Sequence, residues 1–475
     1  MVFSSSLFLL YFFPAFLIVY FLIRGTKWKN LWILLTSILF YAWGAPDFIF
    51  IVVGSIIADF YLVQVMDKTG IKRNKRILMA LSVLLNIGLL AYFKYSNFFI
   101  ENINALLEAM GMTALHWTQV ALPIGISFFS FQKLTYSVDV YRKVHSPLKR
   151  VTDYAMYILM FPQLIAGPIV RFNEIADQIE DRRINETATN RLTGFFRFIL
   201  GLAKKVLIAN VLGEQVDIIF AMDSSGLTMG LSWIGIIAYA FQIYFDFSGY
   251  SDMAIGIGRM IGFDFPENFN NPYISQNISE FWRRWHITLG KFMKDYLYIP
   301  LGGNRVAKSK MFFNLWVVFL ISGLWHGAAW TFVIWGAFHG LFLVLDRLFL
   351  LRFYKKIGKI PSIILTFIIT MVGWALFRAE TLPFAWDYIG TMFSFNFTPS
   401  GIFFEQKFWT ILVIAAFFSL WAAIPGIESW QNRLFSKNHS MRTVLIMVAF
   451  SVLFFIFSLA AITSSGFNPF IYFRF

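Results

Sequence analysis

Long apolar segments follow one another along the whole chain, and this pattern most constrains what the chain can fold into. They recur from residues 3–23 to residues 441–463, most of them about as long as a bilayer-spanning helix. Hydrophobic residues make up 58% of the 475 residues and charged residues only 14%, which is more apolar surface than a water-soluble fold can bury. The sequence therefore predicts an all-α, polytopic integral membrane protein with roughly ten to thirteen transmembrane helices plus re-entrant or interfacial helices.

The charges between these segments predict a topology. Residues 3–23 have no basic residue before them and no small-residue cleavage site after them, which indicates an uncleaved first span. Basic residues follow it directly, so the positive-inside rule places its C-terminal end in the cytoplasm. Three further basic clusters are expected in cytoplasmic loops: Lys68, Lys72, Arg73, Lys75 and Arg76; Arg142, Lys143, Lys149 and Arg150; and Arg347, Arg352, Lys355, Lys356 and Lys359. The net charge of +14 then predicts contact with anionic membrane lipid, and no nucleic-acid partner.

Nothing in the sequence separates one domain from another. The chain has no long linker, no low-complexity tract and no internal repeat. We therefore expect one membrane domain over residues 1–475, with N-terminal helices in 1–118, the core in 119–345 and C-terminal helices in 346–475. Because the chain contains no cysteine, disulfides, thiolate metal sites and thioester intermediates on this chain are excluded.

The middle of the chain is the best candidate for the working region. Residues 242–310 stay rich in aromatic side chains but fill with polar and charged groups. Such groups are costly in lipid unless protein shields them, a wet cavity exposes them or they lie at the membrane interface. This stretch therefore predicts a polar lining within the helical bundle.

Two of the six histidines carry the strongest chemical interest. His326 lies in the apolar sequence SGLWHGAAW, and His286 lies in FWRRWHITLGKF. Burial keeps an imidazole neutral, and a neutral imidazole can accept a proton from a hydroxyl. From spacing alone, however, His326 fits helix packing equally well, and His286 fits an interfacial amphipathic helix better.

Other polar residues of the same region have two interpretations. Asp246, Asp252 and Asp264 either line a tunnel or form a hydrogen-bonded helix junction. Basic residues either face phosphates such as those of coenzyme A or serve as positive-inside charge, which is the better interpretation of any single one; they are Arg283, Arg284, Lys291, Lys294, Arg305, Lys308 and Lys310. Glycine pairs at Gly323 and Gly327, and at Gly336 and Gly340, indicate close helix packing. Phosphate-loop, serine-nucleophile and metal-ligand motifs are missing from the sequence, so no metal is expected.

Several stretches together resemble the membrane-bound O-acyltransferases, most closely the bacterial branch that O-acetylates alginate, other exopolysaccharides and peptidoglycan. The similar stretches are LFYAWG at 39–44, LPIGISFFSFQKLTYSVDVYR at 122–142, FPQLIAGPIVR at 161–171, YFDFSGYSDMAIG at 244–256, FNNPYIS at 269–275, FWRRWHITLGKFMKDYLYIPLGGNR at 281–305 and LWHGAAWTFVIWGAFHG at 324–340. The resemblance covers nearly the whole chain. The combination of FWRRWH and LWHG about forty residues apart is its most specific part.

This resemblance implies a helical tunnel through the membrane, with 119–345 as the catalytic core. The essential histidine of the LWHG motif corresponds to His326, and the second polar position, which is His, Asn or Asp in the family, corresponds to His286. Trp325, Asp246, Ser248 and Asp252 would line the tunnel. The donor would be cytoplasmic acyl-CoA, with acetyl-CoA first and a D-alanyl donor a distant second, and no cofactor would be bound.

The resemblance also implies partners and a location. A secreted or membrane-anchored SGNH-hydrolase-like acetyltransferase would complete the transfer to a polysaccharide, and the chain would lie in the bacterial inner membrane. Two alternatives remain open: a transporter or flippase for polysaccharide or lipid-linked sugar, and a non-catalytic scaffold of an export complex. Internal repeats would favour the first alternative, and dispensability of His326 would favour the second.

Overall fold

The computed structural model describes residues 1–475 except 166, 224–225, 397, 399–400, 437–438 and 468–475. Within the described residues all regular structure is helical, and the helices form two compact units. The first unit comprises Met1–Val2, Leu7–Thr187 and Gly258–Pro266, and the second comprises Phe3–Ser6, Ala188–Ile257 and Glu267–Phe475. The predicted all-α class is confirmed.

Seven of the described helical segments are long and apolar enough to cross a membrane, so the prediction of a polytopic membrane protein is also confirmed. They are Pro46–Lys68, Lys72–Ala109, Met229–Met260, Trp330–Ile357, Lys359–Arg378, Gln406–Ala423 and Met441–Ser464, and a shorter apolar helix covers Phe8–Leu22. The sequence predicts roughly ten to thirteen crossings. The count differs partly because some apolar segments are divided into shorter helices; residues 152–170, for example, contain two helices joined at Met160. In addition, Thr26–Gly44 and Lys308–His326 are single 19-residue helices that are not among these seven.

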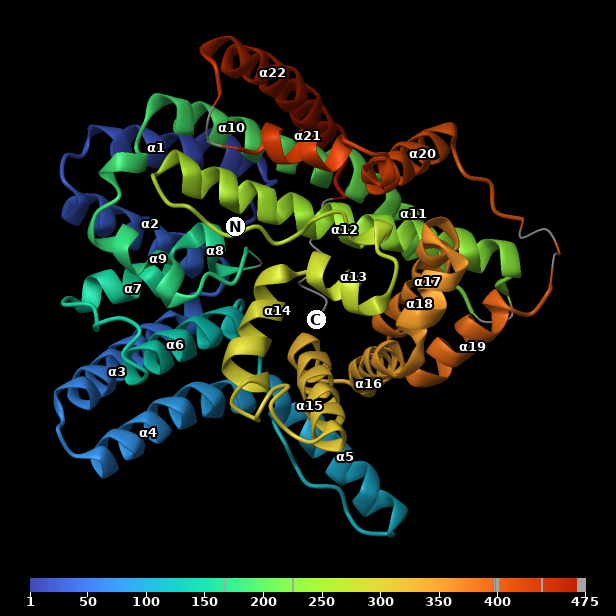
Figure 1. The fold of residues 1–475 in the computed structure, drawn as a ribbon, viewed down its shortest axis with the longest axis horizontal. Helices are drawn as coiled ribbons and strands as arrows, with labels where there is room; N and C mark the ends of the chain where they lie inside the picture. Colours follow the sequence, from blue (N-terminus) through green and yellow to red (C-terminus); the bar gives the residue numbers. More distant parts are fainter. Residues whose placement is uncertain (166, 224–225, 397, 399–400, 437–438, 468–475) are drawn as a thin grey trace. The chain divides into compact units, whose positions relative to one another are not determined.

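The first unit is built from helices that pack in sequential and near-sequential pairs (Figure 1). Its helices are α1 (Phe13–Leu22), α2 (Thr26–Gly44), α3 (Ile49–Lys68), α4 (Lys72–Leu90), α5 (Ser96–Ala109), α6 (Ile126–Tyr141), α7 (Val151–Leu159), α8 (Phe161–Leu164) and α9 (Phe172–Glu180). The closest contacts join α3 to α4, α4 to α6 and α2 to α7.

A buried carboxylate ties four helices of the first unit together. One oxygen of Asp59 on α3 accepts hydrogen bonds from Ser82 (2.5 Å) and Asn86 (3.1 Å) on α4. The other oxygen accepts from Tyr154 on α7 (2.5 Å) and, more weakly, from Ser137 on α6 (3.5 Å). All five of these side chains are fully buried. A buried carboxylate is tolerated at such a position because these donors replace its lost hydration.

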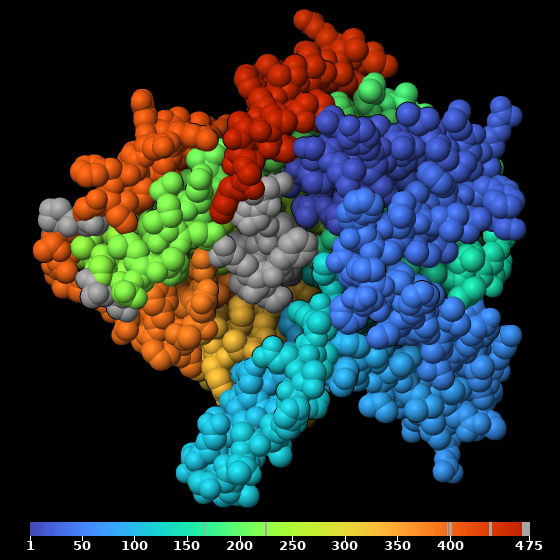
Figure 2. All heavy atoms as spheres, turned by 180° about the vertical axis from the view of Figure 1, so that it is seen from behind, coloured from blue at the N-terminus to red at the C-terminus, as the bar shows by residue number. Residues whose placement is uncertain are grey.

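The second unit holds the remaining helices. They are α10 (Ala188–Ala203), α11 (Asn210–Phe220), α12 (Met229–Met260, whose last residues belong to the first unit), α13 (Ile278–Arg284), α14 (Ile287–Met293), α15 (Lys308–His326), α16 (Trp330–Leu345), α17 (Leu351–Ile357), α18 (Lys359–Arg378), α19 (Leu382–Met392), α20 (Gln406–Leu420), α21 (Ile427–Leu434) and α22 (Met441–Ser464). The C-terminal helix α22 returns to pack along α10, as Figure 2 shows where the red helix lies beside the green one.

The helix pair α15 and α16 has the most extensive contact of the second unit, and glycines permit it. A Cβ atom at Gly323 of α15 would collide with the carbonyl oxygen of Phe332, and one at Gly336 of α16 would collide with the carbonyl oxygen of Phe319. The close helix packing predicted from the glycine pairs is therefore confirmed at Gly323 and Gly336.

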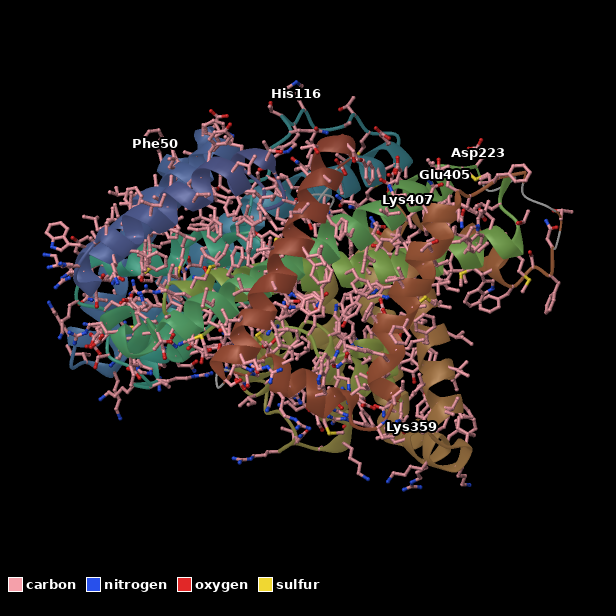
Figure 3. The ribbon with its side chains drawn as sticks, turned by 90° about the horizontal axis from the view of Figure 1, so that it is seen from above. Phe50, His116, Asp223, Lys359, Glu405 and Lys407 are labelled. Atoms are coloured by element: carbon pink, nitrogen blue, oxygen red, sulfur yellow. The ribbon has the colours of Figure 1, made fainter. Side chains whose placement is uncertain are left out.

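Helices α18 and α20 of the second unit run antiparallel, so the start of α18 lies near the end of α20. The ammonium of Lys359, at the start of α18, donates to the carbonyl oxygen of Ala423 just beyond α20 (3.0 Å). Figure 3 shows Lys359 at the opposite end of this unit from Asp223, Glu405 and Lys407. The Lys359 end carries the basic cluster that the positive-inside rule assigns to the cytoplasm.

Candidate active site

His286 lies at a break between two seven-residue helices, α13 and α14. Its backbone is left-handed (φ 46°, ψ 53°), a conformation that costs energy for any residue with a Cβ atom. The neighbouring loop holds this break in place: the N–H of Ile287 donates to the carbonyl of Asn268 (2.9 Å), and the N–H of Asn270 donates to the carbonyl of Arg284 (2.9 Å). Backbone strain maintained in this way is typical of functional positions.

His326 is the last residue of α15 and lies among aromatic rings. Ring centroids of Trp325, Trp335 and Phe377 lie 4.9, 5.1 and 5.3 Å from its own. The ring of His286 lies 6.5 Å away, centroid to centroid. The structure thus brings together the two histidines that are forty residues apart in sequence, and Trp325 contacts both of them (5.9 Å to His286).

A cavity of about 390 Å³ reaches His286, whereas His326 and Trp325 are not among the residues that line it. Its walls are mostly apolar, and three cations lie on its rim; the lining residues are Ser279, Trp282, Arg283, His286, Ile287, Leu289, Gly290, Lys291, Met293, Lys294, Tyr298, Leu315, Val318, Phe319 and Ser322. Leu315, Phe319 and Ser322 repeat at helical spacing along α15, and His326 is the next residue on that stripe.

The rim of this cavity is linked to the basic end of the unit. Tyr298 donates to the side-chain oxygen of Asn304 (2.7 Å), and Arg347 donates to the same oxygen (3.3 Å). Arg347 belongs to the basic cluster that ends at Lys359. The cavity therefore connects a cationic rim with a buried histidine.

Burial controls the charge of His286. Its side chain is 1% exposed, and this desolvation lowers its pKa to about 3, so the ring is neutral at pH 7. The Nδ1 atom lies 3.0 Å from the side-chain oxygen of Asn268, whereas Nε2 has no hydrogen-bond partner among the described residues. A neutral imidazole with one satisfied nitrogen is suited to proton transfer with a bound group.

Of the basic residues considered as phosphate ligands, some line this cavity and others do not. Arg283 and Lys291 are exposed and line the cavity, together with Lys294. Arg284 is engaged elsewhere, by Glu280 (3.0 Å) and Glu428 (2.9 Å). Arg305 lies in the loop between α14 and α15 and is not among the residues lining this cavity.

The three polar residues considered as tunnel lining lie away from the histidine cavity. Ser248 and Asp252 line a second cavity of about 330 Å³, whose wall also includes Asn268. Asp252 pairs with Arg197 and Lys204 (both 2.6 Å). Asp246 is buried, pairs with Lys205 (2.9 Å) and lines neither of these cavities. In the described part of the chain, no group of three or more His, Asp or Glu side chains is placed to hold a metal ion.

Some residues of the site escape sequence reasoning. Ser322 and Trp282 line the cavity, and Asn268 contacts His286. Helical spacing back from His326 would have found Ser322. Asn268 lies in the polar stretch 242–310, but one of several asparagines in PENFNNPY cannot be chosen without the fold.

The fold and site define a class: a multi-pass helical membrane protein with a buried, neutral histidine at the inner end of a cavity. Comparison with known families makes the class specific, because the profile of MBOAT, membrane-bound O-acyltransferase family, matches residues 60–378. The chain belongs to this family and is an O-acyltransferase. The resemblance inferred from the motifs is confirmed.

Individual relatives span most of the chain. It is 42% identical to the "Probable alginate O-acetylase AlgI" of Pseudomonas aeruginosa over 397 residues, which cover 83% of this chain and 75% of the relative. It is 38% identical to the "Peptidoglycan O-acetyltransferase" of Helicobacter pylori over 430 residues, covering 83% and 80%. A more distant relative is the "Teichoic acid D-alanyltransferase" of Bacillus subtilis, 29% identical over 281 residues and covering 54% and 69%.

Proposed function

We propose that this protein transfers an acetyl group from cytoplasmic acetyl-CoA, across the bacterial inner membrane, to a polysaccharide outside. The names of the relatives that cover 83% of this chain support acetyl as the acyl group and alginate or peptidoglycan as the class of acceptor. D-Alanyl is the lesser candidate, because the relative named for it covers only 54% of the chain.

The single observation that carries this proposal is the cavity that joins a cationic rim to His286. Arg283, Lys291 and Lys294 on the rim suit the phosphates of coenzyme A. The apolar walls suit the pantetheine arm and the acetyl group, and the thioester would then lie beside the histidine pair. The basic cluster at this end of the second unit supports entry of the donor from the cytoplasm.

The chemistry divides between the two histidines. His326 acts as the general base that takes the proton of the attacking hydroxyl, and His286 orients the reacting group. The hydroxyl oxygen forms a bond to the acetyl carbonyl carbon, the carbon–sulfur bond breaks, and the proton passes to the sulfur of the leaving CoA. The products are an acetyl ester and CoA-SH. The attacking hydroxyl belongs either to the polysaccharide or to a secreted or membrane-anchored SGNH-hydrolase-like partner that completes the transfer.

The test uses the full-length protein in liposomes with labelled acetyl-CoA. We expect CoA release and acetyl transfer in wild type, and a loss of about 10²–10⁴-fold in His326→Ala, the usual contribution of a general base. His116→Ala is the matched control, since His116 is exposed in a loop far along the sequence from the motif residues (Figure 3).

Sidedness and partner are tested in the same vesicles. Acetyl-CoA supplied only at the cytoplasmic face should support transfer to an acceptor enclosed on the other face, and adding the partner should extend transfer to polysaccharide. Equal rates for wild type and His326→Ala would remove His326 as the base. Transport of intact sugar without ester formation would replace the proposal by the transporter alternative.

A further inference from the structure

Asn268 makes an unusually complete set of hydrogen bonds around the break at His286. Its side-chain oxygen lies 2.8 Å from the hydroxyl of Thr288, 3.3 Å from the backbone N–H of Thr288 and 3.0 Å from Nδ1 of His286. Its side-chain nitrogen donates to Ser251 (3.1 Å). All four residues are at most 2% exposed.

The identity of the amide atoms follows from these partners. A backbone N–H can only donate, so the Asn268 atom that faces Thr288 must be the oxygen. The nitrogen then faces Ser251, whose hydroxyl can accept. An amide oxygen has no hydrogen to give, so Nδ1 of His286 must carry the proton in this contact.

The tautomer of the ring follows in turn. A neutral imidazole carries one proton, so Nε2 of His286 holds the unshared electron pair. The ring lines the donor cavity, and Nε2 is buried without a hydrogen-bond partner among the residues that the structure describes. Nε2 is therefore an acceptor, not a donor, for any group that reaches it from the cavity.

We propose that Asn268 is a positioning residue that fixes His286 in the Nδ1-protonated form and aims its Nε2 lone pair at the reacting group. This inference rests on the proposed acyl transfer for its catalytic meaning. It implies that Nε2 of His286 can only accept a hydrogen bond, from a donor other than the hydroxyl whose proton His326 takes, and that it does not donate one to the acetyl carbonyl oxygen. The orienting role of His286 is thereby that of a hydrogen-bond acceptor.

The charged and titratable groups around His286 leave this assignment intact. His326 approaches from α15, Arg283 comes from α13, and Lys291 and Lys294 come from α14 and the turn that follows it. The loop of Asn268 contributes Glu267, which is bound to Arg197 (2.6 Å). Burial lowers the pKa of His286 and keeps the ring neutral.

The direct test is nitrogen-15 magnetic resonance of the full-length protein, labelled at histidine and reconstituted in lipid. The His286 signals are identified by their disappearance in His286→Ala. In wild type at pH 7 we expect a protonated Nδ1 and an unprotonated Nε2. A protonated Nε2 with a bare Nδ1 would overturn the proposal without any variant of Asn268.

Variants of Asn268 then test whether this residue fixes the tautomer of His286. Asn268→Leu removes the acceptor and should release the tautomer preference, whereas Asn268→Asp keeps the acceptor and should retain the protonated Nδ1. Asn270→Leu is the matched control, since Asn270 lines the same second cavity but donates to Glu428 (3.1 Å) instead of contacting His286. An unchanged tautomer in folded Asn268→Leu would overturn the role of Asn268.

Kinetics separate positioning from support of the fold. Asn268→Leu should lower kcat by about 10- to 100-fold, as loss of an orienting partner does for other functional histidines, with KM for acetyl-CoA within about twofold. Asn268→Asp should restore most of kcat. A wild-type protein with the expected tautomer but no acyl transfer would count against the proposed function, and not against the tautomer assignment.

Discussion

Two buried polar groups, Asp59 in the first unit and His286 in the second, are held in opposite ways. In the first unit both oxygens of Asp59 accept hydrogen bonds from other helices, so its hydrogen-bonding capacity is used to hold the fold. In the second unit His286 lines a cavity, and its ring contacts Asn268 through Nδ1 while Nε2 is buried without a hydrogen-bond partner among the described residues. A satisfied buried group indicates architecture, whereas a half-satisfied group on a cavity wall indicates chemistry.

The helices around the clusters are also held differently. Side-chain hydrogen bonds from three helices converge on Asp59. The helix that ends at His326 is instead held by backbone contact with α16 at Gly323 and Gly336. The position of the helix that ends at His326 therefore depends on close backbone packing against α16.

Removing Asp59 should give the largest effect on stability. Asp59→Ala leaves the buried donors of Asn86 and Tyr154 without their acceptor, which should lower the free energy of unfolding by about 3–5 kcal/mol. Denaturation of the purified protein in detergent measures this change. Asp47→Ala, at an exposed aspartate just before α3, is the control. Equal stability of the two variants would break the architectural interpretation of the Asp59 cluster.

Gly323 tests how the histidine helix is held. Gly323→Ala introduces a Cβ atom against the carbonyl oxygen of Phe332, which should cost about 1–3 kcal/mol of stability and lower activity by displacing His326. Gly390→Ala on α19 meets no atom within 4 Å and should be neutral or slightly stabilising. Thermal unfolding and CoA release measure both variants. Full activity in Gly323→Ala would show that His326 tolerates movement of α15.

The pH dependence of stability follows from His286. Its folded pKa of about 3 lies below the ordinary value of about 6.5, so between these values the unfolded chain binds more protons than the folded protein. Stability from this group is complete above pH 6.5 and falls as the pH falls, by about 2 kcal/mol at pH 5. Denaturation at several pH values should show a smaller loss in His286→Ala than in wild type or His116→Ala. Parallel curves for all three would contradict a buried, neutral His286.

The rim cations should give the smallest effects. Arg283→Gln or Lys291→Gln should raise KM for acetyl-CoA about fivefold, equivalent to about 1 kcal/mol for an exposed ion pair, and added salt should reduce the difference. Arg284→Gln should leave KM unchanged because Glu280 and Glu428 already hold that guanidinium. Steady-state kinetics at two salt concentrations measure these KM values. A larger rise in KM for Arg284→Gln than for Arg283→Gln or Lys291→Gln would contradict binding of acetyl-CoA in this cavity.

Composition and motifs predict the general architecture well. Apolar segments such as 441–463 correspond closely to a helix, α22, because a bilayer-length run has little alternative to a helix. The number of crossings is harder to predict: residues 120–140 form only the 16-residue α6, with buried polar side chains such as Gln132 and Lys133. Packing against other helices buries these polar groups, and hydropathy alone does not predict such packing.

The site was predictable only in part. His326 and His286 stand out as histidines in aromatic sequence, and the structure brings their rings together. The sequence could not show which basic residues line the cavity, because Arg283 lines it whereas its neighbour Arg284 is paired with Glu428. That distinction depends on the short helix α13 and on Glu428, which is more than 140 residues away. The roles of all these residues stay predictions until they are tested.

The left-handed backbone at His286 also limits which mutations this position can accept. Beyond glycine, the residues that adopt this conformation with least cost are asparagine, aspartate and histidine. The family resemblance allows those same three residues at this position. Main-chain geometry thus restricts the genetic variation open to the site before any selection for catalysis acts, and a library that samples all side chains at position 286 should return its most stable proteins within this small set.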